Sequence, residues 1–259
     1  KSDGTIAVVE VEGIILESKP IIEKIHKAEK DEDVKAIIMR INSPGGAVGP
    51  VQEIYQEIRR IDTSKEGKPI YASFGSIAAS GGYYIGAATR KIYSNPGTIT
   101  GSIGVIMQFV NLSKLYDFAK ISMSTVKAGR YKDAGQPTRA LTQEEKDMMD
   151  KLMKGVHKQF VGDIVNLRKD KIKGNIWDHA QGQIFSGESA FKVGLVDELA
   201  SLWVAGRSIH KELKLEGEFN FRFIKKKKKL DLWDLVENLE QAISNFRLGA
   251  SSRPSPMLM

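Results

Sequence analysis

Short apolar runs alternate with amphipathic stretches along most of the chain. The runs are rich in Val, Ile and Ala, as expected of strands that are buried in a sheet. In the amphipathic stretches apolar residues repeat at helical spacing, as Val51, Ile54 and Ile58 do. The predicted strands are 5–12, 34–41, 69–74, 91–94, 104–108 and 124–127. The predicted helices are 21–31, 51–61, 81–88, 112–119, 142–168 and 201–213, and the stretch 184–198 is expected to hold a short strand, a helix and a strand. This alternation predicts an α/β fold with βαβ units and a mostly parallel sheet.

The last part of the chain changes in character. Lys225–Lys229 is a run of five lysines, and 230–248 has apolar residues on one face of a predicted helix. The final stretch, 249–259, is rich in Ser and Pro and is expected to be flexible. We therefore divide the chain into a main domain at 1–215, a basic run with an amphipathic helix at 216–248, and a tail at 249–259.

Composition excludes several classes of function. The 259 residues include 39 basic and 32 acidic side chains, a mixed surface that is not typical of a nucleic-acid-binding protein. The chain has no cysteine, which excludes disulfides, thiol nucleophiles and cysteine-bound zinc. The four histidines, His26, His157, His179 and His210, show no metal-binding spacing. We expect no metal, no cofactor and no nucleic-acid partner, and we interpret each histidine as a surface residue.

Ser80 stands at a predicted turn between the strand 69–74 and the helix 81–88. Its neighbours Ala78, Ala79 and Gly81 are small, so a substrate backbone could come close. Free N–H groups at a helix N-terminus can stabilise an oxyanion, which favours a nucleophilic serine. A serine that merely caps the helix would have the same local sequence.

A nucleophilic Ser80 needs a base, and none of the histidines is an obvious one. A lysine can take the proton when burial or a nearby positive charge keeps it neutral. Lys132 lies in a Gly-containing loop after the predicted strand 124–127. It is the candidate, although from composition alone it is one lysine among many and a solvated side chain is the alternative.

Two further turns are rich in glycine. Asn42-Ser-Pro-Gly-Gly46 follows a predicted strand and leads into a helix, at the strand end where α/β sheets bind ligands. Its N–H groups, together with that of Gly81, could form an oxyanion hole. The second turn, Thr100-Gly-Ser102-Ile-Gly104, precedes a predicted strand. Both segments could equally be plain turns.

Four motifs in order give the chain a specific resemblance. They are Asn42-Ser-Pro-Gly-Gly46, Gly75-Ser-Ile-Ala-Ala-Ser80-Gly-Gly-Tyr-Tyr84, Thr100-Gly-Ser-Ile-Gly-Val-Ile106 and Lys127-Ala-Gly-Arg-Tyr-Lys132-Asp133. Between Thr5 and about Ala200 the chain resembles the signal peptide peptidase A family in its short, single-unit form. These are Ser–Lys peptidases of the ClpP/crotonase superfamily. The resemblance implies a ClpP/crotonase-like fold of repeated ββα units, with a mostly parallel sheet and flanking helices.

The resemblance also implies roles for individual residues. Ser80 matches the nucleophile and Lys132 the general base. Gly46 and Gly81 match the oxyanion-hole amides, and Ser102 matches the hydroxyl that orients the lysine. In the family, neighbouring protomers of a ring- or dome-shaped homo-oligomer build the active sites together.

The same resemblance implies a place and a substrate. The family hydrolyses remnant signal peptides and other apolar peptides through an acyl-enzyme. It is membrane-anchored by an N-terminal segment, absent from this chain, with the catalytic domain outside the cytoplasm. Two other functions stay open: a crotonase-like acyl-CoA enzyme on the same scaffold, and a non-catalytic membrane scaffold that uses Lys225–Lys229 and the helix 230–248.

Overall fold

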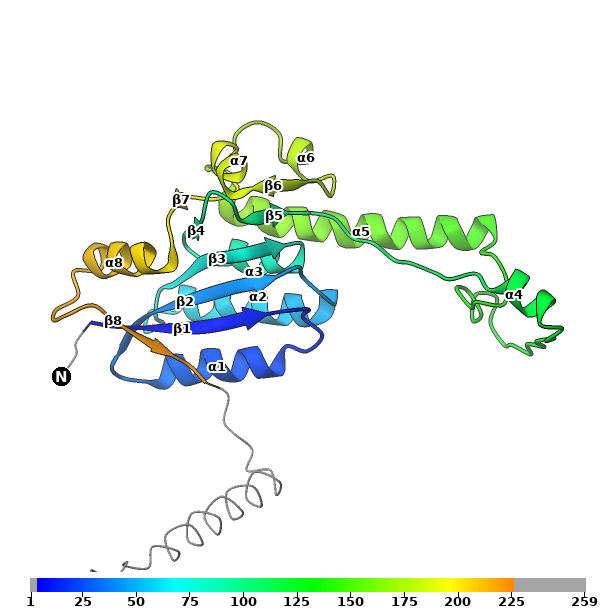
Figure 1. The fold of residues 1–259 in the computed structure, drawn as a ribbon, viewed down its shortest axis with the longest axis horizontal. Helices are drawn as coiled ribbons and strands as arrows, with labels where there is room; N and C mark the ends of the chain where they lie inside the picture. Colours follow the sequence, from blue (N-terminus) through cyan, green and yellow to red (C-terminus); the bar gives the residue numbers. More distant parts are fainter. Residues whose placement is uncertain (1–3, 226–259) are drawn as a thin grey trace, which may run out of the picture. The chain divides into compact units, whose positions relative to one another are not determined.

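A computed structural model describes residues 4–225, and these contain one sheet with helices around it (Figure 1). The strands are β1 (Thr5–Glu12), β2 (Val34–Ser43), β3 (Ile70–Ala79), β4 (Ile92–Ser94), β5 (Ile99–Gly101), β6 (Ile184–Ser186), β7 (Glu198–Leu199) and β8 (Asn220–Phe223). The helices are α1 (Lys19–Lys30), α2 (Val48–Thr63), α3 (Gly81–Ala87), α4 (Ser113–Phe118), α5 (Gln143–Arg168), α6 (Ile176–His179), α7 (Gly187–Lys192) and α8 (Leu202–Glu212).

The sheet is parallel except at one edge. Its strands lie in the order β6-β5-β3-β2-β1-β8, with β4 between β3 and β7, and β5–β6 is the antiparallel pair. The predicted α/β fold with a mostly parallel sheet and flanking helices is confirmed. β8 was not predicted, and it extends the sheet past residue 215 by pairing with β1.

Alternate residues of the central strands belong to two different apolar clusters, one on each face of the sheet. Ala7, Val9 and Val11 of β1 belong to the larger cluster, which also contains buried residues of α1, α2, α3 and α5. Ile6 belongs to a smaller cluster with Ala205 and Ile209 of α8. The central strands are therefore buried on both faces, which explains their nearly continuous apolar sequence.

β3 forks the sheet and so determines where Ser80 lies. Its first half pairs with β4, and its last residues, Ile77–Ala79, pair with β5. An irregularity against β2 makes this possible, because Asn42 Oδ1 accepts hydrogen bonds from the N–H groups of Ser76 and Ile77, both at 3.2 Å. Asn42 thus fixes the backbone at Ser76 and Ile77, just before the end of β3 and Ser80.

α5 is fixed at both ends. Thr142 and Glu145 form a capping box at its N-terminus. At its C-terminal end the buried Arg168 guanidinium pairs with Asp197 at 2.9 Å and donates to the Gly194 carbonyl at 3.1 Å. The Asp197 carboxylate also accepts from the Ile92 N–H at 2.7 Å, so this end of α5 is tied to β4.

Residues 105–142, which we call the arm, connect β5 to α5 (Figure 1). The predicted strands 104–108 and 124–127 were wrong, since the arm contains only the short helix α4. The reason is a lack of partners: Ile106 is 82% exposed and Val126 is 99% exposed, so their β-prone sequence has no strand to pair with in residues 4–225.

Most of the C-terminal prediction concerns residues after 225. The lysine run after Lys225, the amphipathic stretch 230–248 and the tail 249–259 lie outside the described residues. Within residues 4–225, no helix combines the length and the apolar character that crossing a membrane requires.

Candidate active site

Ser80 occupies a strained turn between β3 and α3. Its φ of 53° and ψ of −120° are unfavourable for a residue with a side chain. The Ser80 N–H donates to the Gly101 carbonyl of β5 at 2.8 Å, and the Ser80 carbonyl accepts from the Tyr84 N–H at 2.9 Å. A sharp strand-to-helix turn of this kind lifts the serine hydroxyl out of the backbone.

The Ser80 hydroxyl does not cap the helix it precedes. Its side chain makes no capping hydrogen bond to α3, and the residue is half-buried. The capping interpretation therefore lacks the interaction on which it depends. Among residues 4–225 the hydroxyl has no hydrogen-bond partner, and Ser80 lines two adjoining pockets.

Gly46 and Gly81 come together beside Ser80. Gly45, with φ of +102°, packs so closely on the Ser80 turn that a Cβ there would lie 2.6 Å from the Gly81 nitrogen. A Cβ on Gly46 would collide with the Ile15 carbonyl. Within residues 4–225, the N–H groups of Gly46 and Gly81 donate no backbone hydrogen bond. Two free donors thus adjoin the serine, the arrangement that an oxyanion requires.

Ser102 lies at the same site, directly after β5. Its φ of 51° is also in the left-handed region, and its N–H donates to the Gln183 carbonyl at 2.8 Å. Ser102 and Ser80 line one pocket of about 520 Å³, together with Pro44, Gly46, Val48, Gly104, Val105, Ile106, His157, Gln181 and Gly182. The sequence motifs around Ser80, Gly46 and Ser102 therefore meet in space.

A second, narrower pocket adjoins Ser80 and is apolar. It measures about 30 Å³, and its lining includes Val51, Tyr84, Val156 and Phe160. The Tyr84 ring stacks on Phe160 with centroids 4.3 Å apart. The Tyr84 hydroxyl donates to the Asp163 carboxylate, and burial together with this contact raises the Tyr84 pKa. The wall of the pocket is thus held rigidly and stays uncharged.

Lys132 is not at this site in a single chain. It is exposed and lines neither pocket. Its neighbour Asp133 pairs with Arg139, which pairs in turn with Glu145 in the first turn of α5. From Glu145 to Phe160, which lines the narrow pocket, the helix rises about 22 Å, whereas a lysine side chain reaches about 6 Å. The structure therefore brings Ser80, Gly46, Gly81 and Ser102 together and leaves Lys132 apart.

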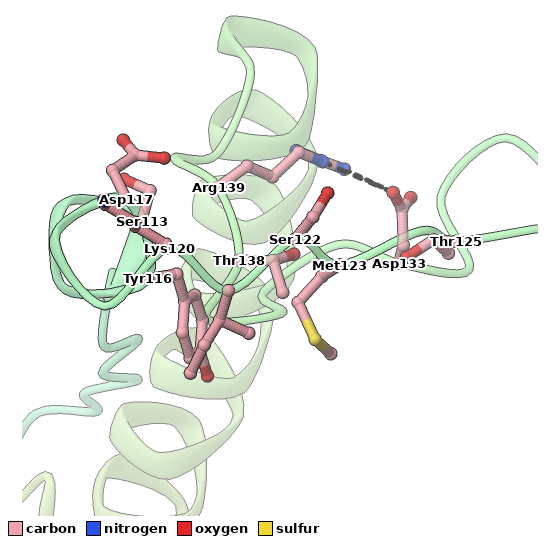
Figure 2. Close-up of a pocket in the computed structure, with 11 residues that line it drawn as sticks. Ser113, Tyr116, Asp117, Lys120, Ser122, Met123, Thr125, Asp133, Thr138 and Arg139 are labelled. Atoms are coloured by element: carbon pink, nitrogen blue, oxygen red, sulfur yellow. Dashed lines mark hydrogen bonds and ion pairs between the residues drawn. The ribbon is translucent and has the colours of Figure 1, made fainter.

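Ion pairs hold the part of the arm that carries Lys132. Figure 2 shows Arg139 pointing at Asp133. Both residues line an open pocket of about 650 Å³. Lys127 also pairs with Asp133, at 2.5 Å, and Arg139 contacts Glu145 at 2.6 Å. The Arg139 hydrogen bond lowers the pKa of Glu145 to about 2, and the Lys127 hydrogen bond lowers that of Asp133. The arm is thereby pinned to the start of α5.

The arm is also unusually apolar for an exposed segment. Ile106, Phe118 and Val126 are more than 80% exposed, and other large apolar side chains around them are at least 39% exposed, namely Met107, Phe109, Val110, Leu115, Ile121, Met123 and Tyr131. Such a concentration on one segment is typical of a protein interface.

Among residues 4–225, one cluster has the composition of a metal site. His26, Glu29 and Glu57 place their ligand atoms within 4.8 Å of one another. Arg60 already pairs with both carboxylates, at 2.9 Å and 2.7 Å. The guanidinium offsets part of the negative charge from within the chain, and the cluster lies on α1 and α2 rather than in the Ser80 pockets.

His157 is the residue of this site that the sequence interpretation missed. We interpreted it as a surface residue because it has no metal-binding spacing, but it lines the wider pocket with Ser80. The sequence held no signal for it, because its position beside Val156 and three residues before Phe160 acquires meaning only from the pocket that those two residues line.

A strained serine beside free amides, on a parallel sheet of this topology, is the arrangement of a serine peptidase with a ClpP-like fold. The family model "Peptidase family S49" matches residues 62–216, and "Clp protease" matches 13–97. The chain belongs to peptidase family S49 and is a serine protease.

Individual relatives agree with this assignment. The chain is 38% identical over 200 residues to "Putative protease slr0021" of Synechocystis, a match that covers 76% of this chain and 70% of that protein. It is 32% identical to "Serine protease SPPA, chloroplastic" of Arabidopsis thaliana, over 73% of this chain and 28% of the relative. It is 33% identical to "Protease 4" of Haemophilus influenzae, over 76% and 33%. The chain thus spans only about a third of the two longer relatives.

Proposed function

We propose that this protease is an endopeptidase with a Ser80–Lys132 dyad that hydrolyses remnant signal peptides and other apolar peptides. The observation that carries the proposal is the strained Ser80 turn, whose hydroxyl is free and whose neighbours Gly46 and Gly81 offer unpaired N–H groups. These are the parts that acyl transfer needs, apart from a base.

The chemistry proceeds in two stages. A neutral lysine amine takes the Ser80 proton while the oxygen attacks the peptide carbonyl, and the Gly46 and Gly81 N–H groups stabilise the oxyanion. The resulting ammonium gives its proton to the departing amine, which leaves an acyl-enzyme on Ser80. Water, deprotonated by the same amine, then attacks the ester. The ammonium returns this proton to the Ser80 oxygen as the second product leaves, which restores the enzyme.

We propose that the lysine comes from a neighbouring protomer. Lys132 lies on an arm that is anchored at the far end of α5 from the Ser80 pockets. The arm carries the exposed apolar residues Ile106, Phe118 and Val126, which a second copy of the chain would cover. An arm that reaches forward to the next copy gives a head-to-tail interface, and such an interface forms a ring when its rotation closes. Ser102, next to Ser80, would then orient the incoming amine.

The pockets support an apolar peptide as the substrate. The narrow pocket of about 30 Å³ is lined by Val51, Val156 and Phe160 and has room for a small side chain. Signal peptides combine an apolar core with small residues at the cleavage site. An extended peptide could therefore place a small residue in this pocket while its carbonyl faces Ser80.

We also propose that the protein acts while anchored in a membrane, with its catalytic domain outside the cytoplasm. The absence of cysteine suits an oxidising compartment. Digestion of intact cells or spheroplasts by an added protease would test the topology. Degradation of the catalytic domain without membrane rupture is expected, and protection until rupture would contradict this part of the proposal.

A fluorophosphonate probe tests the chemistry, because it labels only an activated serine. We expect labelling of the wild type on Ser80 and none in Ser80→Ala. The wild type should also cleave an apolar fluorogenic peptide. An unlabelled wild type would overturn the proposal and would favour an acyl-CoA enzyme on the same scaffold.

A further inference from the structure

The wider Ser80 pocket contains a polar side chain that the proposed dyad does not use. His157 of α5 lines this pocket with Ser80, Ser102 and Gln181. Its ring lies perpendicular to Trp177, with centroids 5.4 Å apart. Its Nε2 is buried and has no hydrogen-bond partner within residues 4–225. A polar atom that has lost water without gaining a partner costs free energy, and a turn of the ring about its Cβ–Cγ bond would present this nitrogen to a group bound in the pocket beside Ser80.

Residues of α5 line both pockets beside Ser80, which together we call the groove, and make its two halves chemically different. Val156 and Phe160 line the narrow apolar pocket, whereas His157 lines the wider one. Gly46, Val48, Ser80, Gly104 and Val105 line both, so a peptide bond at Ser80 has access to each half. Because successive side chains of an extended peptide point in opposite directions, neighbouring substrate residues can enter different pockets.

Gln181 completes the polar half. Its Nε2 donates to the Trp177 carbonyl at 3.0 Å, which orients the amide and leaves its Oε1 without a partner among the described residues. A neutral imidazole has one donor and one acceptor, and the Gln181 Oε1 adds a second acceptor. Hydroxyl and carboxamide groups both donate and accept, so they match this set, while an aliphatic group would leave it unpaired.

We propose that His157 is a specificity-determining residue that hydrogen-bonds a hydroxyl or carboxamide side chain of the substrate in the wider pocket. The preferred peptide thus combines a small apolar residue, held in the narrow pocket, with Ser, Thr, Asn or Gln at a nearby position. This inference rests on the proposed peptidase function and adds a polar requirement to an otherwise apolar substrate.

Matched fluorogenic peptides test the inference on the full-length oligomer. Pairs that differ only as Thr against Val, or Gln against Met, are placed at each of the three positions on either side of the cleaved bond. We expect the wild type to favour the polar member at one position by about tenfold in kcat/KM, expressed mainly in KM. His157→Leu should abolish that preference, and His157→Gln, which keeps a donor and an acceptor, should restore part of it.

Lys158→Leu is the matched control, because Lys158 is the next residue of α5, is exposed and lines neither pocket. It should keep the wild-type preference. A wild type without any polar preference, or a preference that survives in His157→Leu, would overturn the role of His157. An equal loss on both members of every pair would show a structural role and overturn it as well. Failure of the proposed function looks different: the wild type would then cleave no peptide, and Ser80 would not react with the probe.

Discussion

The Ser80 N–H donates to the Gly101 carbonyl at 2.8 Å, and this bond ties a strained serine to the end of β5. This hydrogen bond connects the end of β3 to the segment that carries Ser102. The same segment continues into the arm. The turn that carries Ser80 and the segment that carries Ser102 are therefore held side by side.

The strain at Ser80 predicts a difference in stability between two inactive variants. At a φ of 53°, glycine avoids a steric cost that alanine still has. We expect Ser80→Gly to be more stable than Ser80→Ala by about 1 kcal/mol in the free energy of unfolding, and both to be inactive. Urea denaturation of the two variants measures the difference. Equal stabilities would show that the turn is not strained.

The dyad predicts a pair of inactive but folded variants. Ser80→Ala and Lys132→Ala should each lower kcat/KM for an apolar peptide by about 10³-fold or more, because one removes the nucleophile and the other the base. Lys132→Arg should fail to restore activity, since a guanidinium stays protonated. Full activity in Lys132→Ala, measured with circular dichroism as the folding check, would remove lysine from the mechanism.

The narrow pocket predicts how substrate preference can be changed. Val156 is half-buried and lines this pocket but not the wider one. Val156→Ala should enlarge the space and shift preference at one peptide position from Ala toward Val or Leu by about tenfold. Profiling with a positional peptide library reads the shift, with Lys158→Ala as the control on the same helix. An unchanged profile would mean that this pocket does not receive a substrate side chain.

The ion pairs of the arm predict a response to acid. Glu145 has its pKa lowered from 4.5 to about 2 by Arg139, so its contribution is complete above about pH 4.5 and is lost as the pH falls toward 2. Cleavage of the arm by pepsin should therefore become faster through this range. Glu145→Gln should be cleaved readily at pH 4, where the wild type resists. Asp150→Asn, which alters an exposed pair on the same helix, serves as the control. Equal cleavage of Glu145→Gln and the wild type would show that Glu145 does not hold the arm.

Features that depend on residues close together in the sequence could be predicted, whereas features that depend on distant partners could not. The Ser80 turn, the Gly45–Gly46 turn and the helix that begins after Thr142 depend on neighbours in sequence, and all were found where predicted. The arm was not, because its apolar residues suggested strands while their partners are absent from residues 4–225. Short β8 was missed because it is a strand only through its pairing with β1. His157 became visible only when the packing of α5 placed it beside Ser80.

The central claim is that Ser80 and Lys132 act together across two protomers, and subunit complementation tests it most directly. Ser80→Ala and Lys132→Ala chains, each inactive alone, are unfolded together, refolded as mixed oligomers and assayed on an apolar peptide. Each mixed oligomer should contain intact sites in which one chain supplies the serine and its neighbour the lysine. With random mixing in a head-to-tail ring, about a quarter of the wild-type activity should return. If mixed oligomers form and stay as inactive as the single variants, the two residues do not act across the interface.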